Sequence, residues 1–412
     1  MSTRNNFLAR KGPSRLSIYP GNSQPPRRDR LPLAGCYLGC LLLALASVTV
    51  CLAQAGPASR SSLKVNLPAD SPVTLLSADW GESSASERGS AMVLNLHTSL
   101  SLRNSSSRRI RGITWMVLSQ EVTPGGRASV TKASLDIAPG EAFPVRLDLR
   151  LLRPLAPGQL QNGAPLVQMS LDGVLFEDLS FYGPNRLESR RSMTAMELEA
   201  QRDRRHFLQV LSASGAEALR KECLASLARQ ADTPRLDVQL ARGRATAVEQ
   251  ERQVQFAFLR FPGAPVDPVA GMAQVAGGEA RAPQLEVHNK SSRAVKSMEI
   301  GWLLRDSRGR EFWAGTVPAR ASLSPGQKTE VLGQTAFRFA EPSGAPVAID
   351  SMTGFVSQVE FADGSLWIPS RNALGDPRLQ RALAPSAEEQ RLTSIYRKKG
   401  LGAVVEELKK FQ

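Results

Sequence analysis

Apolar and polar residues alternate with a period of two in several short segments of the chain. Segments of this kind lie at residues 90–103, 110–118, 143–149 and 167–171, and again at 284–288 and 295–304. A period of two places successive side chains on opposite faces of a β-strand. Turns rich in Gly, Pro, Asn and Ser separate the segments. The pattern therefore predicts two sets of short antiparallel strands.

The two sets are copies of one sequence pattern. Residues 174–186, VLFEDLSFYGPNR, return as residues 359–371, VEFADGSLWIPSR, with six identities in thirteen positions. The motif Asn-x-Ser-Ser-Arg at residues 104–108 returns at residues 289–293, and both pairs are separated by 185 residues (359 − 174 and 289 − 104). The sequence therefore predicts one structural unit that occurs twice.

A helical pattern follows each set of strands. After the first set, Thr194-x-x-Glu197 and Ser214-x-x-Glu217 have the form of capping boxes, which begin helices. After the second set, Ser386-x-x-Glu389 has the same form, and apolar residues at helical spacing continue to Phe411. A helical pair is therefore expected behind each set of strands.

The order of these motifs resembles the immunoglobulin-type modules of bacterial envelope proteins. The order is a strand, an Asn-x-Ser-Ser turn, a strand with Trp, a Pro-Gly turn, and then a Phe-x-Asp hairpin, and it covers about residues 64–187 and 250–371. The resemblance implies two tandem antiparallel immunoglobulin-like β-sandwiches, and adhesion, scaffolding or partner binding as their role. The expected domains are sandwiches at 64–187 and 236–371, helical segments at 188–231 and 372–412, a basic disordered N-terminus at 1–30 and an apolar segment at 31–55.

The apolar segment predicts export. A run of apolar residues from 31 to 52 follows a basic segment and ends in Ala53-Gln54-Ala55, a pattern that suits cleavage before Gly56. The run is also long enough to be a retained signal-anchor helix that crosses a membrane. In either case the basic end stays in the cytoplasm. The chain is expected to be periplasmic or secreted after cleavage, or anchored to the inner membrane with its C-terminal part outside.

The charge and the cysteine content limit which binding partners and which disulfide bonds are expected. Without the first 55 residues, 45 basic and 37 acidic residues remain, an excess that could favour anionic envelope polymers or lipid headgroups. Nucleic acid is not an expected partner, because the chain is exported and has no basic platform with interleaved aromatic residues. Three of the four cysteines lie in the apolar run, so Cys223 has no partner for an internal disulfide.

No motif predicts a catalytic, metal or cofactor site. His97, His206 and His288 lack the spacing of metal ligands, and no nucleophile elbow or phosphate-binding loop is present. Asp178 and Asp363 occupy one hairpin tip in each copy, where Asp favours the turn itself. Asn104 and Asn289 begin glycosylation-type sequons, but we interpret them as turn residues.

The repeat offers one candidate binding surface. Tyr182 and Trp367 share a repeat position, as do Arg186 and Arg371, and these four residues are the candidate ligand or partner surface. The predicted function is a non-catalytic interaction or structural protein of the cell envelope, whose partner is a protein or an envelope polymer. Residues 31–52 add a membrane contact if they are not cleaved. The alternative is a carbohydrate- or peptide-active envelope enzyme, or its membrane-anchored accessory subunit.

Overall fold

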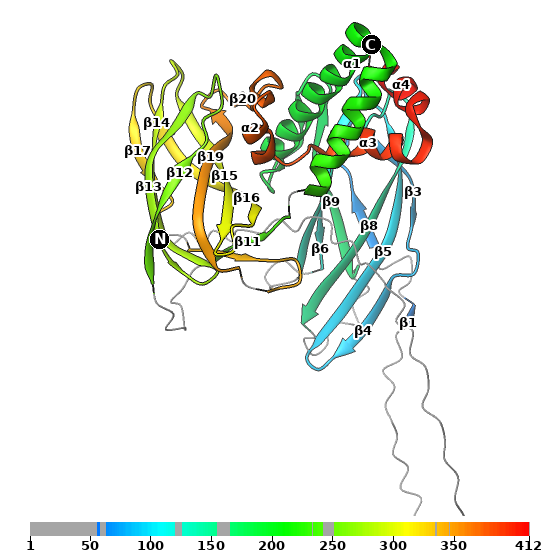
Figure 1. Cartoon of the computed structure of the whole chain (residues 1–412). Coiled ribbons are helices and arrows are strands. Elements are labelled where there is room, and N and C mark those ends of the chain that lie inside the picture. The colour runs from blue at the N-terminus through cyan, green and yellow to red at the C-terminus, as the bar shows by residue number, and fades with distance from the viewer. Residues whose placement is uncertain are drawn as a thin grey trace, which may run out of the picture. The chain divides into compact units, whose positions relative to one another are not determined.

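A computed structural model describes residues 56–57, 63–119, 126–154, 165–232, 234–241, 251–333, 336–345 and 347–411. Within these ranges the protein is mainly β, and helices follow each set of strands (Figure 1). The residues of the predicted basic N-terminus and of the predicted signal or anchor segment lie outside the described residues. Among the residues that are described, no helix is both long and apolar enough to cross a membrane.

The first set of strands forms two five-stranded sheets. One contains β1 (Gly56–Pro57), β3 (Val73–Asp79), β4 (Ser84–Arg88), β5 (Ala91–Asn104) and β8 (Ala142–Pro154). The other contains β2 (Leu63–Asn66), β6 (Ile110–Leu118), β7 (Arg127–Lys132), β9 (Val167–Phe176) and β10 (Phe181–Tyr182). Buried residues of both sheets, including Leu100, Val145, Trp115 and Val174, form one core.

The second set of strands forms one continuous ten-stranded sheet. Its strands are β11 (Asp237–Ala241), β12 (Arg252–Phe258), β13 (Val266–Ala276), β14 (Glu279–Asn289), β15 (Val295–Asp306), β16 (Glu311–Leu323), β17 (Lys328–Val331), β18 (Ala336–Ala340), β19 (Ile349–Phe361) and β20 (Leu366–Trp367). The sheet is continuous because β12 pairs with both β13 and β19. Its outer strands also approach each other, since Arg235, just before β11, forms a β-bridge with Trp313 of β16.

Strand pairing matches between the two sets. Ile110 of β6 pairs with Phe176 of β9, and Val295 of β15 pairs with Phe361 of β19, 185 residues further on (361 − 176). The parallel pairs match too, since β2 pairs with β9 and β12 pairs with β19. Phe176 and Phe361 therefore lie in equivalent places, as the sequence repeat predicts.

The first helical segment is one long helix with a break. α1 (Ser189–Asp232) is interrupted at Gly215, whose φ of 78° is non-helical, so the second capping box lies at a real helix boundary. The start predicted at Thr194 is wrong. The helix begins a full turn earlier, at Ser189, and the side chain of Asn185 accepts a hydrogen bond from the backbone N–H of Arg190 in its first turn at 3.0 Å.

Three helices and a short 3₁₀ turn follow the second set of strands. They are η3 (Asn372–Leu374), α2 (Pro377–Ala382), α3 (Ala387–Lys399) and α4 (Leu401–Lys409). Ser386 caps α3 as predicted, because its hydroxyl accepts the backbone N–H of Glu389 at 3.0 Å. The sequence pattern missed α2, a helix of six residues that is capped by Asp376 and begins at Pro377.

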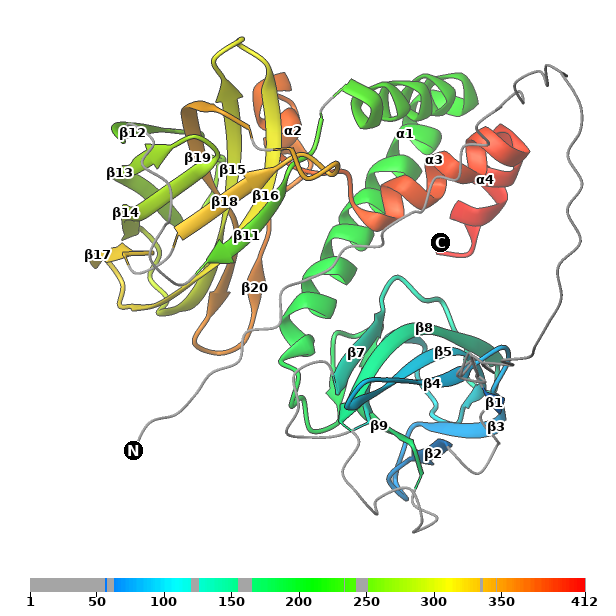
Figure 2. The same ribbon diagram turned by 90° about the horizontal axis from the view of Figure 1, so that it is seen from below.

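The helices pack on one another and contact both sets of strands. α3 and α4 lie beside α1 (Figure 2), around a shared core that includes Phe207, Cys223 and Leu392. α2 packs instead on the second set, where Leu379 and Ala382 contact a cluster with Phe355. These contacts bring α1, α2, α3 and β16 to one place.

Candidate functional site

A pocket of about 70 Å³ lies where α1, α2 and the first turn of α3 meet β16. Its charged lining is Arg202, Arg229, Arg235, Arg371, Arg381 and Glu389. The lining thus contains five guanidinium groups and one carboxylate, together with the indole of Trp313. We refer to this feature as the arginine-lined pocket.

Arg371 lies at the inner side of the pocket and joins α1 to α3. Its Nη2 donates to Oε1 of Glu222 at 2.8 Å. Its Nη1 lies 3.6 Å from Oδ1 of Asp203 and 3.7 Å from Oε2 of Glu389. Only 13% of its side chain is exposed. Burial of such a charge is costly unless it is paired, and three carboxylates pair with it here.

Two further arginines complete the inner network. Arg202 donates to both carboxylate oxygens of Asp203, at 2.8 and 3.1 Å, and to the carbonyl of Pro369 at 3.1 Å. Arg229 donates to Oε1 of Glu389. The inner arginines Arg202, Arg229 and Arg371 are therefore matched in number by the carboxylates of Asp203, Glu222 and Glu389.

Glu222 is ionised because of its neighbours. Its Oε1 lies 3.2 Å from Nε2 of His206, although the ring nitrogen is not aligned for a hydrogen bond. The imidazole of His206, followed by the guanidinium groups of Arg371 and Arg229, lowers the pKa of Glu222 to about 2, against the opposing effect of burial. The carboxylate is thus a fixed negative charge at neutral pH.

Arg235 and Arg381 lie at the mouth of the pocket and are exposed. Among the described side chains, which do not include those of Asp232 and Asp237 on either side of Arg235, neither guanidinium forms an ion pair with a carboxylate. The guanidinium carbon of Arg235 lies 5.8 Å from the ring of Trp313. Among the described side chains, the guanidinium groups of Arg235 and Arg381 therefore remain without an ion pair after the inner arginines have been paired.

Trp313 holds both of these arginines in place. Its backbone N–H donates to the carbonyl of Pro234 at 3.0 Å, and its carbonyl accepts the N–H of Leu236 at 2.9 Å, on either side of Arg235. Its indole Nε1 donates to the carbonyl of Ala382 at 3.1 Å, directly after Arg381. The backbone next to Arg235 and the backbone next to Arg381 are thus both bonded to Trp313.

The four residues of the predicted surface are not brought together in this pocket. Arg371 lines it, but Trp367 is half-buried and packs against the cores of the second set of strands. The Tyr182 hydroxyl donates to Oδ1 of Asp70 at 2.8 Å, and burial, followed by this contact, raises the pKa of Tyr182 to about 12. Arg186 is exposed just before α1. Arg235, Trp313 and Arg381 were missed, because they come from three elements with no common sequence pattern.

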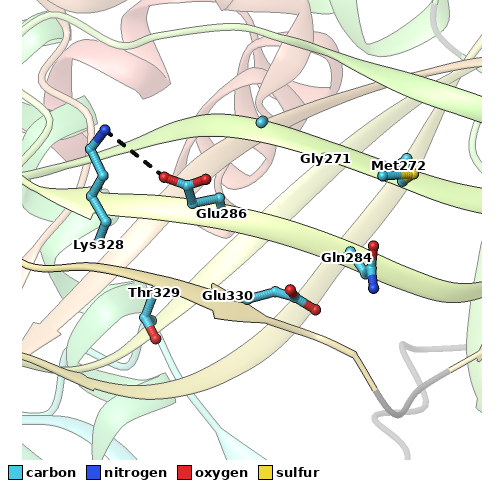
Figure 3. Close-up of a pocket in the computed structure, with 8 residues that line it drawn as sticks. Gly271, Met272, Gln284, Glu286, Lys328, Thr329 and Glu330 are labelled. Carbon is cyan, nitrogen blue, oxygen red and sulfur yellow. Dashed lines mark ion pairs between the residues drawn. The ribbon is translucent and has the colours of Figure 1, made fainter.

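A wider depression of about 390 Å³ lies on the outer face of β13, β14 and β17. Figure 3 shows its side chains along three adjacent strands, with Lys328 paired to Glu286 at 3.9 Å. Glu286 and Glu330 are direct cross-strand partners. These groups are spread along an exposed face and do not converge, so the smaller arginine-lined pocket is the stronger candidate.

Asp178 and Asp363 hold the turns on which they lie. Each accepts the backbone N–H of the serine two residues later, at 3.0 Å for Asp178 and 2.9 Å for Asp363. The N–H and hydroxyl of Ser365 are the main cause that lowers the pKa of Asp363 to about 2. Each aspartate also pairs with an arginine, Arg108 or Arg293, of the Asn-x-Ser-Ser-Arg loop.

The histidines occur in separate places. His97 pairs with Asp148 at 3.1 Å on an exposed sheet face, and His206 lies beside Glu222 in the helical layer. Among the described residues, no group of three or more His, Cys, Asp and Glu side chains is arranged to hold a metal ion.

No family model matches the chain, and no curated protein matches it. Among solved structures, a β-glucosidase from Kluyveromyces marxianus is 10% identical over 65% of this chain and 45% of its own, with a TM-score of 0.13. An allantoicase is 8% identical over 68% of this chain and 83% of its own, with a TM-score of 0.07. The chain thus spans less than half of the β-glucosidase. Similarity at this level carries no argument about fold or activity.

Proposed function

We propose that this protein is a non-catalytic interaction protein of the cell envelope, and that it binds its partner at the arginine-lined pocket. One observation carries the proposal. Arg235 and Arg381 bring two positive charges, without an ion pair among the described side chains, to the mouth of a pocket whose inner arginines are already paired. A partner that presents an anionic group, whether a protein or an envelope polymer, complements this charge.

The network behind the pocket supports a preformed binding site. Arg371 contacts carboxylates of both α1 and α3, and Arg202 ties α1 to the carbonyl of Pro369. Side chains that are already fixed lose little conformational entropy when a partner binds. The buried ion pairs thus position the site, whereas the mouth arginines are available for recognition.

The roles of the acidic residues also support a non-catalytic protein. A general acid needs a pKa near the working pH, which usually means a raised value for a carboxyl group. Glu222 and Asp363 instead have their pKa values lowered to about 2, from 4.5 and 3.8. Burial raises the pKa of Glu197, but this carboxylate is enclosed by Arg111 and Arg204 and does not line the pocket. The carboxylates of Glu222 and Asp363 act as permanent acceptors for neighbouring donors.

We further propose that each set of strands is an immunoglobulin-like β-sandwich, within the boundaries 64–187 and 236–371, and that each is followed by its own helical segment. Three features support this proposal: equivalent strand pairings, a parallel pair between an early and a late strand in each set, and a core shared by two sheets in the first set. The helices of both copies then pack together as one layer.

We propose an extracytoplasmic location, on the basis of the apolar run that ends in Ala53-Gln54-Ala55. Intact-mass measurement of the native protein, purified from fractionated cells, tests this proposal. A mass that begins at Gly56 would indicate cleavage, and a full-length mass in the membrane fraction would indicate an anchor. Recovery of the full-length chain in the cytosolic fraction would contradict export.

Site-specific photo-crosslinking tests the binding function. A photoreactive amino acid replaces Gln380, which lines the pocket, or Arg378, which lies on the same helix and is exposed outside it. In the full-length chain in native envelopes, we expect an adduct of defined mass from position 380 and not from position 378. The proposal is wrong if neither position gives an adduct, or if both give the same adduct equally.

A further inference from the structure

We infer that the arginine-lined pocket is an oxyanion site, in which Arg235 and Arg381 bind a phosphate or carboxylate group carried by the partner. The inference rests on the proposed function and names the chemistry that the partner must present. Guanidinium groups offer planar pairs of N–H donors, which match the oxygens of phosphate and carboxylate groups.

The two arginines are positioned before any ligand arrives. The β-bridge with Trp313 fixes the backbone around Arg235, through hydrogen bonds of 2.9 and 3.0 Å on either side of it. Arg381 is fixed by its neighbour Ala382, which is buried in a core cluster and accepts the Trp313 indole N–H. Both side chains therefore begin from rigid backbone positions beside the same aromatic ring.

The charge balance favours an anion over a cation. Among the described residues, Glu389 is the only carboxylate in the lining, and it is already bound by Arg229, Ser226 and Arg371. A cation would have to compete with these groups and would face Arg235 and Arg381. An anion meets two arginines that have no carboxylate partner among the described residues.

The start of α3 adds to the positive potential. Ala384 and Pro385 line the pocket directly before Ser386, the N-cap of this 13-residue helix. The N-terminal end of a helix carries a partial positive charge, and it favours anions nearby. The helix end supports the inference, but the arginines carry it.

The size of the pocket limits what enters it. A volume of about 70 Å³ holds a few water-sized groups. It accommodates one oxyanion group, but not a length of polymer backbone. The recognised group is therefore a terminal or projecting one, such as a phosphate substituent or the carboxylate of an acidic side chain.

Calorimetric titration of the full-length protein with inorganic phosphate and with acetate, at low ionic strength, tests the inference. We expect saturable binding of at least one of the two anions. Arg235→Gln and Arg381→Gln should each weaken it about tenfold or more, because each removes a charge-assisted contact. Arg378→Gln is the matched control on α2 and should leave affinity unchanged. Stronger binding of one anion identifies the oxyanion as phosphate or carboxylate.

Three results would overturn the inference: no saturable binding of either anion, no loss in Arg235→Gln and Arg381→Gln, or an equal loss in Arg378→Gln. The last result would indicate an adventitious, non-specific charge effect only. The proposed function is tested separately by the adduct at position 380. An adduct without anion binding leaves the proposed function standing and rejects the oxyanion site, whereas anion binding without an adduct does the reverse.

Discussion

Asn104 and Asn289 make the same hydrogen bonds in the two halves of the protein. The Nδ2 of Asn104 donates to three carbonyl oxygens, at 2.8, 3.2 and 3.1 Å, and the Nδ2 of Asn289 donates to three equivalent carbonyls at the same distances. Each Oδ1 accepts the N–H and hydroxyl of the serine two residues later. Both side chains are fully buried, so these asparagines organise loops from inside.

Replacement of either asparagine by alanine should destabilise its half of the protein. Asn104→Ala and Asn289→Ala each remove one buried amide that donates to three carbonyl groups and accepts a serine N–H and hydroxyl, and we expect a loss of about 2–4 kcal/mol. Urea unfolding gives the size of the loss. Hydrogen exchange with mass spectrometry should place it in strands β5 to β8 for Asn104→Ala and in β14 to β18 for Asn289→Ala.

The adjacent turn serines provide the control. Ser107 and Ser292 occupy exposed positions in the same loops, three residues after each asparagine. Ser107→Ala and Ser292→Ala should change stability by less than about 0.5 kcal/mol. If one asparagine variant proved as stable as the parent protein, the shared hydrogen-bond pattern would not stabilise both loops.

The local features of this fold could be predicted, and the features that depend on distant pairing could not. Alternation of side chains located β5, β6 and β9, and the repeated Asn, Phe and Asp positions predicted equivalent loops, since short-range patterns determine these features. That β12 pairs with both β13 and β19, and so joins the second set into one sheet, depends on partners as far as 96 residues away (352 − 256). No periodicity within a segment contains that information.

The candidate site lay beyond sequence reasoning for the same reason. Arg371 was a candidate because it repeats Arg186, but the repeat predicts like surroundings, and the surroundings differ. Arg186 is exposed, whereas Arg371 is buried between carboxylates of α1 and α3. The difference arises where helices of both copies meet, and a comparison of each copy with the other does not detect such contacts.

Trp313→Phe should weaken the attachment of α2 and leave the hydrophobic core filled. Phenylalanine keeps most of the ring but removes the indole N–H that binds the Ala382 carbonyl at 3.1 Å. One such bond contributes about 1 kcal/mol, so amide protection in α2 should fall by roughly fivefold in hydrogen exchange. Phosphate or acetate affinity should fall as well, because Arg381 loses its fixed position.

The matched control is Trp367→Phe. Trp367 packs against the same cluster as Trp313, and no hydrogen bond from its indole to the described residues is present. This variant should leave α2 protection within twofold of the parent. Equal loosening of α2 in both variants would mean that ring volume, rather than the hydrogen bond of Trp313, holds the helix.

Cys223 should be unreactive in the folded protein. Its side chain is fully buried in the helical core, and burial, followed by the charge of Glu222, raises the pKa of its thiol to about 11. At pH 8 this leaves about 100-fold less thiolate than an ordinary cysteine has. Iodoacetamide labelling, followed by peptide mass spectrometry, should find Cys223 unmodified in the native state and modified in denaturant.

An exposed neighbour provides the comparison for this labelling experiment. Leu224 is 44% exposed on the same turn of α1, so Leu224→Cys should be labelled quickly under native conditions. Rapid native labelling of Cys223 itself would show that the contact between α1 and α3 opens readily, and the rigid pocket proposed above would lose its support.

Part of the stability that the protein loses in acid should come from Glu222. Its pKa of about 2 in the folded protein lies below its ordinary value of 4.5. A carboxyl group with a lowered pKa stabilises the fold at pH values above 4.5, and the contribution disappears as the pH falls from about 4.5 to about 2. The shift corresponds to about 2–3 kcal/mol for this largely buried side chain.

Glu222→Gln should therefore be less stable than the parent at pH 7 by about that amount, and the two proteins should converge near pH 2. Unfolding midpoints measured at intervals from pH 7 to pH 2 follow this convergence. Glu217→Gln is the control, because Glu217 pairs with Arg220 on the exposed face of the same helix, where an ion pair contributes little. Parallel pH profiles for the parent and Glu222→Gln would indicate that His206, Arg371 and Arg229 do not hold this carboxylate in its charged form, and the inner network would then need another source of stability.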